Sequence, residues 1–172
     1  MPANSALASS LTEEFLRLSR EQLRERPHRI EGCLRRLSDE QIWGRQHIVE
    51  NAIGNLVLHL CGSLRTWIIA GVGGQPIDRD RDAEFAWRDP MPAGELIALL
   101  HRTIADAEGV LARVTPEDLA RERVIRDRPF TALHAIYHAV EHFAEHTGQI
   151  IWATKRMTGE DLGFERYLQG GR

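Results

Sequence analysis

The chain has few cysteines, and their scarcity excludes two classes of small protein. Only Cys33 and Cys61 occur among 172 residues, each within an apolar stretch that we expect to be helical. Two cysteines are too few for a secreted disulfide framework or a cysteine-type zinc site. We therefore expect both to be free, buried thiols in a reducing compartment. The length predicts one domain with a single core, covering residues 1–172.

Excess charge of one sign and long apolar runs are also scarce. The net charge is −3 at pH 7, and the arginines are scattered among acidic residues, so nothing favours binding to nucleic acid or to an anionic membrane. By inspection, no window approaches the ~18 apolar residues of a membrane span. Residues 1–10 lack the basic and apolar segments of a signal peptide. We therefore expect a cytoplasmic protein with neither a nucleic-acid nor a membrane partner.

Strand patterns are missing as well. The sequence has no sustained period-two alternation and no Asn-Gly hairpin turn. Apolar residues recur instead at helical spacing in four long segments, at about residues 10–37, 50–70, 92–114 and 131–158. The sequence therefore predicts an all-α fold, a four-helix bundle.

Short polar motifs predict where some helices begin. Ser10 with Glu13 has the spacing of a capping box, as does Ser38 with Gln41, and the segment 115–118 opens another short turn. Pro27 falls inside the first helix. Because proline lacks an N–H and its ring clashes with the preceding turn, we expect it to kink or break that helix.

Two segments are expected to be irregular. Residues 75–92 are polar and contain three prolines, which predicts a long loop across one end of the bundle. The alternating charges at 78–84 (DRDRDAE) are interpreted as solvated side chains rather than as a carboxylate metal site. Residues 159–172 are expected to form a short tail, from which three apolar side chains could pack back on the core: Phe164, Tyr167 and Leu168.

The last predicted helix carries four histidines at i, i+4 spacing: His134, His138, His142 and His146. Each four-residue step rotates a side chain by ~40°, so the set sweeps ~120° and one ion cannot bind all four. Glu141 and Glu145 mark the solvent side of this helix. We therefore predict that His142 and His146 turn inward, about one turn apart, and that His134 and His138 lie in solvent.

A third histidine could complete a metal site with this pair. His59 lies at the flank of the apolar stripe of segment 50–70. Residues 34–42 weakly repeat in residues 111–119, which suggests two related helical hairpins whose second and fourth helices face each other. We therefore predict a metal site made by three histidines: His59, His142 and His146. Three imidazoles leave an open position for water or substrate.

The remaining histidines are expected to lie on the surface: His28, His47 and His101. All-nitrogen ligation suits zinc, nickel, copper or iron, and of these we expect zinc or nickel. The catalytic residues, if there are any, cannot be named from the sequence. Two other interpretations stay open at this point. All the histidines could be surface residues, or the two HxxEH matches, at 138–142 and 142–146, could indicate a metallopeptidase.

Several strings resemble the DinB/YfiT-like superfamily. They are segments 51–60 (NAIGNLVLHL) and 141–150 (EHFAEHTGQI), extended by 37–43 and 158–164. The resemblance covers most of the chain and implies a four-helix bundle, often dimeric. It also implies a divalent metal held by one histidine of the second helix and an HxxxH pair of the last, which are His59, His142 and His146 here. Glu145 stands where many members carry a further histidine.

The resemblance also implies a choice of functions. Some members are thiol-dependent transferases or isomerases, so we expect a metal-dependent enzyme that uses a low-molecular-weight thiol and a small-molecule substrate. The alternatives are a hydrolase that uses metal-bound hydroxide, or a non-enzymatic, metal-binding stress-response dimer. Trp152 and Ile69 are predicted on the outer faces of their helices. Exposed apolar groups of this size suggest that the protein is a homodimer.

Overall fold

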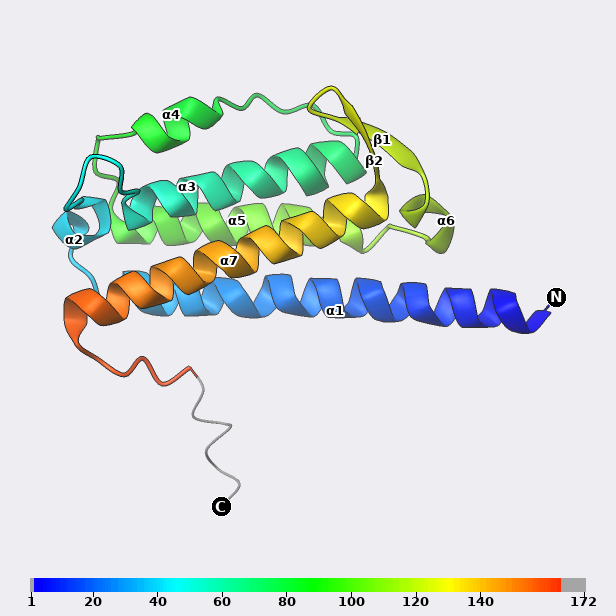
Figure 1. Ribbon diagram of the computed structural model, residues 1–172, viewed down its shortest axis with the longest axis horizontal. Helices are drawn as coiled ribbons and strands as arrows, with labels where there is room; N and C mark the ends of the chain where they lie inside the picture. The colour runs from blue at the N-terminus through cyan, green and yellow to red at the C-terminus, as the bar shows by residue number, and fades with distance from the viewer. Residues whose placement is uncertain (1, 165–172) are drawn as a thin grey trace, which may run out of the picture.

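The computed structural model describes residues 2–164, in which four long helical segments pack together (Figure 1). They are α1 (Pro2–Leu34), α3 (Ile53–Leu64) continued by the π-helix η1 (Arg65–Val72), α5 (Ala93–Leu111) and α7 (Ala132–Thr158). Helices α5 and α7 each contact both α1 and α3. The fold is thus mostly helical, and α3 and α7 meet as the weak repeat suggests.

Helix α7 has the bounds that the sequence predicts. The Thr131 side chain caps its first turn by accepting from the backbone N–H of His134. It ends at Gly159, which adopts φ 70°, a left-handed conformation that suits glycine. Glu141 and Glu145 are exposed, while Phe143 and Ile150 are buried. The rotation deduced for this helix is therefore confirmed at these positions.

Helix α1 differs from the prediction at two points. It already includes Ser10 within its interior, so the capping box predicted at Ser10 and Glu13 is wrong. It also continues through Pro27 to Leu34, so Pro27 does not break the helix. Pro27 itself is buried. A single missing hydrogen bond in a helix of 33 residues is outweighed by the burial of neighbouring apolar side chains such as Ile30.

The second long segment begins later and ends later than predicted, at Ile53 and Val72. Within the described residues, one helix is long enough and apolar enough to cross a membrane, judged by length and composition alone: Ile53–Val72. The expectation that no window approaches a membrane span is therefore wrong. However, 83% of the apolar window is buried within the fold, and the core helix of a soluble protein passes the same test.

Short helices connect the long ones. The capping box predicted at Ser38 is confirmed at the start of α2 (Asp39–Trp43), and the capped turn predicted at 115–118 is α6 (Pro116–Leu119), with Thr115 as its N-cap. The expected loop between the second and third helices contains an unpredicted helix, α4 (Arg81–Ala86), capped by the Asp80 side chain. Helix α4 packs along α3, so this segment does more than cross the end of the molecule (Figure 1).

The expectation of a chain without strands is wrong in one place. Strands β1 (Glu122–Ile125) and β2 (Arg128–Thr131) form an antiparallel hairpin just before α7. Arg126 and Asp127 form its turn with φ of 53° and 61°. Two consecutive positive φ values are typical of the two-residue turns that favour Asn-Gly, so the residue types here gave no signal. The hairpin docks on η1, where Ile125 packs against Gly71.

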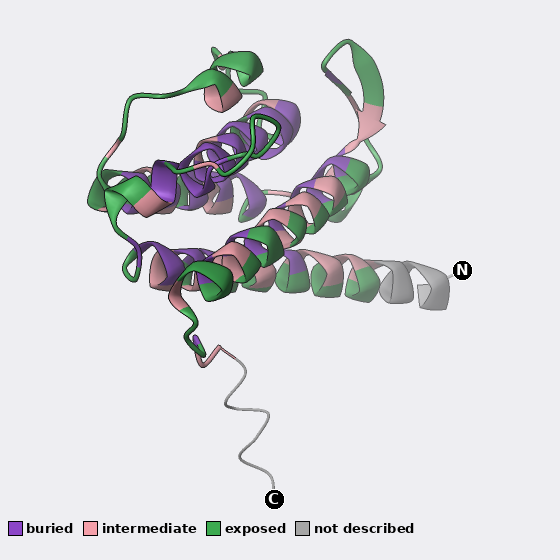
Figure 2. Cartoon of the chain, turned by 60° about the vertical axis from the view of Figure 1, so that its left-hand side comes forward, coloured by how far each residue is buried: buried purple, intermediate pink, exposed green. Residues whose placement is uncertain are grey.

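The core lies between the four long segments. Helices α1, α5 and α7 have a buried face and an exposed face, whereas α3 and η1 are buried on nearly all sides (Figure 2). Cys33 and Cys61 are both buried and free, as predicted. Ile69 is also buried, at 6% exposure, so its predicted outward position is wrong. Phe164 packs against the core beside Gly32. Tyr167 and Leu168, also expected to pack back, lie outside the described residues.

Candidate metal centre

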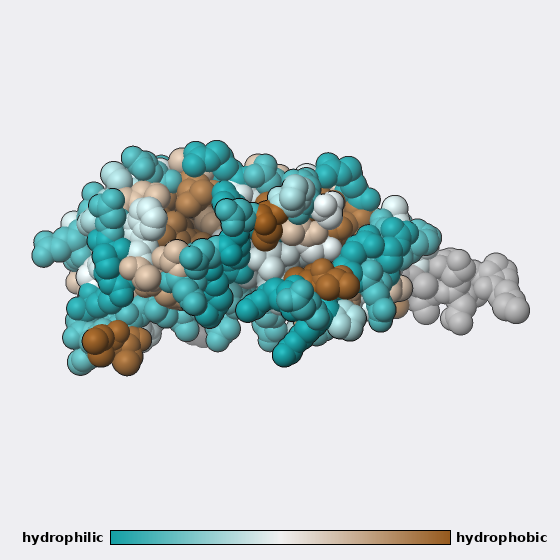
Figure 3. All heavy atoms as spheres, turned by 90° about the horizontal axis from the view of Figure 1, so that it is seen from above, coloured by the Kyte–Doolittle hydropathy of each residue, from teal (hydrophilic) through white to brown (hydrophobic). Residues whose placement is uncertain are grey.

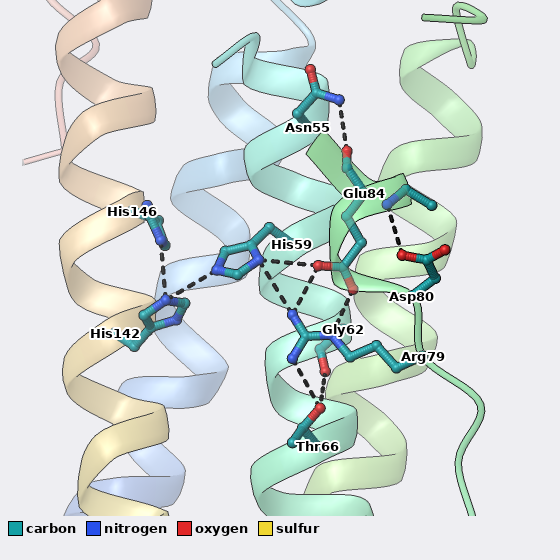
Figure 4. A network of polar contacts seen from close by, with 10 residues as sticks. Asn55, His59, Gly62, Thr66, Arg79, Asp80, Glu84, His142 and His146 are labelled. Atoms are coloured by element: carbon teal, nitrogen blue, oxygen red, sulfur yellow. Dashed lines mark hydrogen bonds and ion pairs between the residues drawn. The ribbon is translucent and has the colours of Figure 1, made fainter. Parts of the chain in front are cut away.

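The structure brings three histidine nitrogens together between α3 and α7. The Nε2 atom of His142 lies 3.2 Å from His59 Nε2 and 3.1 Å from His146 Nε2 (Figure 4). His59 projects from α3 toward α7, and His142 and His146 project back from α7. His59 is 5% exposed and the other two are half-buried. The three side chains predicted from the sequence therefore converge at one point.

The spacing of these nitrogens suits a small divalent cation. Ligands at ~2.0–2.1 Å from a tetrahedral zinc ion are roughly 3.3–3.4 Å from one another. The two measured Nε2–Nε2 distances lie within a few tenths of an ångström of that value. No fourth histidine, cysteine or carboxylate of residues 2–164 belongs to this cluster. Such a site would keep a coordination position for water or substrate.

A carboxylate on α4 orients His59. Glu84 Oε2 lies 3.0 Å from His59 Nδ1, and Arg79 binds both Glu84 oxygens, at 2.7 and 2.8 Å (Figure 4). A carboxylate opposite an imidazole accepts the Nδ1 proton, which leaves the lone pair on Nε2. The approach of Arg79 Nη2 to His59 Nδ1, at 3.3 Å, is then packing, since neither group can accept from the other.

His146 is oriented in the same way by its own helix. Gln149 Oε1 lies 2.7 Å from His146 Nδ1, which places the His146 lone pair on Nε2 as well. Both lone pairs face His142 Nε2, which has at most one proton to donate. The three imidazoles therefore cannot satisfy one another, whereas a single cation would accept a lone pair from each. His142 Nδ1 is buried without a hydrogen-bond partner in residues 2–164, so its tautomer can follow what binds at Nε2.

Burial and neighbouring charges keep two of the imidazoles neutral, those of His59 and His142. Burial, followed by the neighbouring His146 and His59, lowers the pKa of His142 to about 3. Burial also lowers the pKa of His59, although Glu84 opposes this effect. Burial would raise the pKa of Glu84, but Arg79 and His59 outweigh it and hold that pKa below its usual value. Near neutral pH, His59 and His142 are therefore neutral, with a carboxylate behind His59, and metal binding requires neutral imidazoles.

Sequence reasoning missed Glu84 and Arg79. Both belong to the charged run that was interpreted as solvated, and both are partly buried against α3. A signal for them was present. Asp80 is a good N-cap, and the run ends in the apolar pair Ala83 and Phe85, which flank Glu84 and predict a short amphipathic helix. Phe85 packs on the His59 ring, with centroids 4.5 Å apart.

The other histidines follow the prediction only in part. His28, His47 and His134 are exposed, as expected. His138 is half-buried instead, because the Trp67 ring of η1 lies 4.3 Å from its own ring. His101 is also half-buried, and its Nε2 lies 2.7 Å from Glu31 Oε2 across the contact between α5 and α1. The surface position predicted for these two is therefore wrong.

A cavity begins beside the centre. It measures about 510 Å³ and is lined on α3 by Leu56, one turn before His59, and on α7 by Gln149, which binds His146. Glu145 and Trp152 also line it. A small molecule in this cavity would therefore contact Gln149, which orients His146.

Replacing Glu84 by glutamine should weaken metal binding by about 10–100-fold, the usual cost of losing an outer-shell partner. Glutamine keeps an acceptor for His59 Nδ1 but leaves the Arg79 charge uncompensated. The dissociation constant for Zn²⁺, measured by competition with a chromophoric chelator, checks this expectation. Asp82→Asn removes an exposed carboxylate from the same helix and should leave the constant within about twofold of wild type. Equal effects of the two variants would contradict the role of Glu84.

The metal-free protein should lose stability as pH falls from about 6.5 toward 5. The folded state lowers the pKa of His59, His138 and His142, with burial as the largest cause in each case. The unfolded chain therefore binds more protons below the ordinary histidine pKa of ~6.5, so the free energy of unfolding decreases as pH falls through that window. Above it these groups contribute no pH dependence. The Tm of the chelator-treated protein measures this slope, which should be shallower in His142→Gln; an unchanged slope would contradict the assignment.

Comparison with known proteins supports the same fold. The sequence family described as "Protein of unknown function (DUF1572)" matches residues 10–165. No curated protein matches the chain. The crystal structure of a conserved protein from Enterococcus faecalis is similar, with a TM-score of 0.69 and 17% identity over 84% of this chain and 97% of that one.

A second solved structure with a similar fold is that of a DinB-like protein. That protein comes from Bacillus cereus ATCC 10987, and the match has a TM-score of 0.64 and 18% identity over 87% of this chain and 94% of that one. At these identities the likeness concerns the fold. The chain therefore belongs to the family of unknown function DUF1572, and its DinB-like fold agrees with the DinB/YfiT-like superfamily that its sequence resembles.

Proposed function

We propose that this protein is a divalent-metal-dependent transferase or isomerase that acts with a low-molecular-weight thiol. The observation that carries the proposal is the convergence of His59, His142 and His146 on one point, with their Nε2 atoms facing one another. These three residues would hold the ion; imidazole ligation suits zinc, nickel, copper or iron, and of these we propose zinc or nickel. The overall architecture that goes with this function is a four-helix bundle of the DinB/YfiT type.

A divalent cation at this point would act as a Lewis acid and favour the deprotonated form of a bound thiol or water near neutral pH. Other residues of the protein orient the imidazoles. Glu84 and Gln149 hold the proton on Nδ1 of His59 and His146, Arg79 keeps Glu84 ionised, and Phe85 covers one side of the His59 ring.

The thiol would come from outside the chain. Burial raises the pKa of Cys61 to about 11, and it raises the pKa of Cys33 as well. Neither residue belongs to the histidine cluster. Both are therefore inert thiols at neutral pH. A thiol cosubstrate could instead reach the centre through the cavity between Leu56 and Gln149.

Conjugation of a thiol to an electrophile tests the proposed activity. The metal-loaded protein would be incubated with cysteine, glutathione, bacillithiol or mycothiol and with chlorodinitrobenzene as a model electrophile. We expect metal-dependent formation of the thioether with at least one thiol, and its loss in His142→Ala. If metal is bound but no thiol reacts, the transferase assignment fails. A hydrolase or a non-enzymatic, metal-binding stress-response dimer would then be favoured, and ester hydrolysis by the loaded protein would separate these two.

We also propose that the protein is a cytoplasmic homodimer, and we expect light scattering to give about twice the mass of one chain. Trp152 on α7 is 62% exposed, and large apolar groups in such positions commonly form contacts between subunits. The face seen in Figure 3 is mostly hydrophilic, with separate hydrophobic patches. Trp152→Glu should shift the mass toward the monomer, whereas a monomeric wild type would contradict the proposal.

A further inference from the structure

A second cavity lies beyond His59 along the second long segment, at Thr66 to Gly71, whereas the first is lined by Leu56, before His59. It measures about 400 Å³ and lies between η1, the start of α4 and the β1–β2 hairpin. Thr66, Gly71 and Arg79 form part of its wall nearest α3, and Arg81 and Arg126 line it from α4 and from the hairpin turn. The remaining lining residues are apolar: Ala70, Ile77, Val124 and Ile125.

The charge of this cavity is one-sided. Three arginines line it, and no carboxylate is among its lining residues. Glu84 compensates Arg79, but Arg81 and Arg126 form no ion pair with any residue of 2–164. The nearby Asp78 and Asp80 line a different cavity, next to Cys61 and Trp87, and the Asp80 side chain is engaged at the α4 N-terminus. Two positive charges are therefore left without a partner around a hollow space.

Guanidinium groups around a cavity are suited to oxyanions. An arginine offers a planar set of N–H donors that match the oxygens of a carboxylate or a phosphate group. The Thr66 hydroxyl holds Arg79 in place rather than binding the anion, since it accepts from Arg79 Nη1 at 2.9 Å and donates its proton to the Gly62 carbonyl at 3.0 Å. The aliphatic side chains of Ile77, Val124 and Ile125 would cover the uncharged part of the same ligand. The chemistry thus fits a small organic anion rather than an inorganic ion alone.

Two contacts connect this cavity to the histidine cluster. Arg79 binds Glu84, which orients His59 (Figure 4). The Arg81 guanidinium lies 4.8 Å from the centre of the Phe85 ring, and Phe85 packs on His59. A ligand anchored by the arginines would therefore lie beside the groups that hold His59.

We propose that the arginine-lined cavity binds the carboxylate or phosphate group of a small, partly aliphatic substrate. The proposal deepens the function proposed above and rests on it, since it assigns the charge of the molecule on which the metal centre acts. On the second long segment, this cavity is lined by residues after His59 and the cavity at Gln149 by Leu56, before it. The two reactants would thus approach the centre from different ends.

Direct titration of the purified protein with potassium succinate, butyl phosphate and inorganic phosphate tests this site. Calorimetry should detect binding of succinate or butyl phosphate, and the comparison of the two identifies which oxyanion is preferred. Arg126→Gln and Arg81→Gln should each weaken that binding by about tenfold, a usual cost of losing one charged hydrogen bond. Arg128→Gln changes the same charge in the same hairpin outside the cavity lining and should change affinity less than about twofold.

The anion titration tests the arginine-lined cavity independently of whether the three histidines bind a metal. The same titration in His142→Ala reports on the arginine site even if no metal binds, and the metal content of Arg126→Gln reports on the histidine site. If neither succinate nor butyl phosphate binds the wild type at millimolar concentration, the proposal is overturned. Equal losses in Arg126→Gln and Arg128→Gln would also overturn it, because they would show a general charge effect. Arginine and glutamine are both unbranched at Cβ, so Arg126→Gln should leave the strain of the left-handed backbone at this position unchanged.

Discussion

Replacing His142 by alanine should abolish stoichiometric metal binding. His142 is the central member of the cluster, since its Nε2 atom is within 3.2 Å of both other ligand nitrogens. Loss of an outer-shell partner alone costs about 10–100-fold in affinity, so loss of this imidazole should cost more than about 100-fold. Elemental analysis after dialysis, together with chelator competition, measures both the stoichiometry and the dissociation constant.

Two companion variants make this result interpretable. His134→Ala removes an exposed histidine from the same helix and should leave metal content unchanged. His142→Gln keeps most of the side-chain volume, so it separates loss of the ligand from the cavity that alanine would create in a half-buried site. If His142→Gln folds and still retains one equivalent of metal, the three-histidine centre is ruled out.

The features of the fold that the sequence predicted are those that depend on neighbouring residues. Helix α7 has a threonine cap at one end, a glycine at the other and a regular apolar stripe between them, and its bounds were correct. The capping boxes at Ser38 and Thr115 also depend on contacts three residues apart. Such interactions are encoded locally, so a single sequence is enough to identify them.

The features that were missed depend on contacts between distant segments. The hairpin strands have four residues each, too few to show alternation, and their turn at Arg126 and Asp127 carries no glycine. Their position depends on packing against η1, more than 50 residues earlier. Glu84 likewise resembles a surface charge until α4 docks on α3, which brings it to His59. Local composition cannot report such docking.

The histidines show where the rotation argument ends. It placed His142 and His146 on the inward flank of α7 correctly, because that flank depends only on helix geometry. His138 was predicted in solvent, but Trp67 of η1 packs against the His138 ring, and helix geometry alone cannot show this contact. The angle of a side chain about its own helix can thus be deduced from sequence, but its burial also depends on what the neighbouring helix carries.

The support of the metal centre also depends on the absence of a side chain. Gly62 lies on α3 one turn after His59, and a Cβ atom there would overlap the Glu84 carboxylate and lie 2.6 Å from Arg79 Nε. Gly62→Ala should therefore displace Glu84 and Arg79 from α3. We expect a loss of about 10–100-fold in metal affinity, as for other outer-shell changes, and a decrease of about 1–3 kcal/mol in the free energy of unfolding. Urea denaturation and chelator competition measure the two effects.

Gly109→Ala provides the matched control for this substitution. Gly109 also lies inside a long helix, α5, but the nearest atom to an added Cβ would be 3.9 Å away, on Arg113. Without a clash, alanine should raise stability by about 0.5–1 kcal/mol, because it restricts the unfolded chain and favours helix, and metal affinity should not change. Opposite signs for the same chemical change would show that the close approach of α4 to α3, rather than helix propensity, decides the outcome at Gly62. If Gly62→Ala were as harmless as Gly109→Ala, then Glu84 would not be held against α3, and His59 would have to be oriented in some other way.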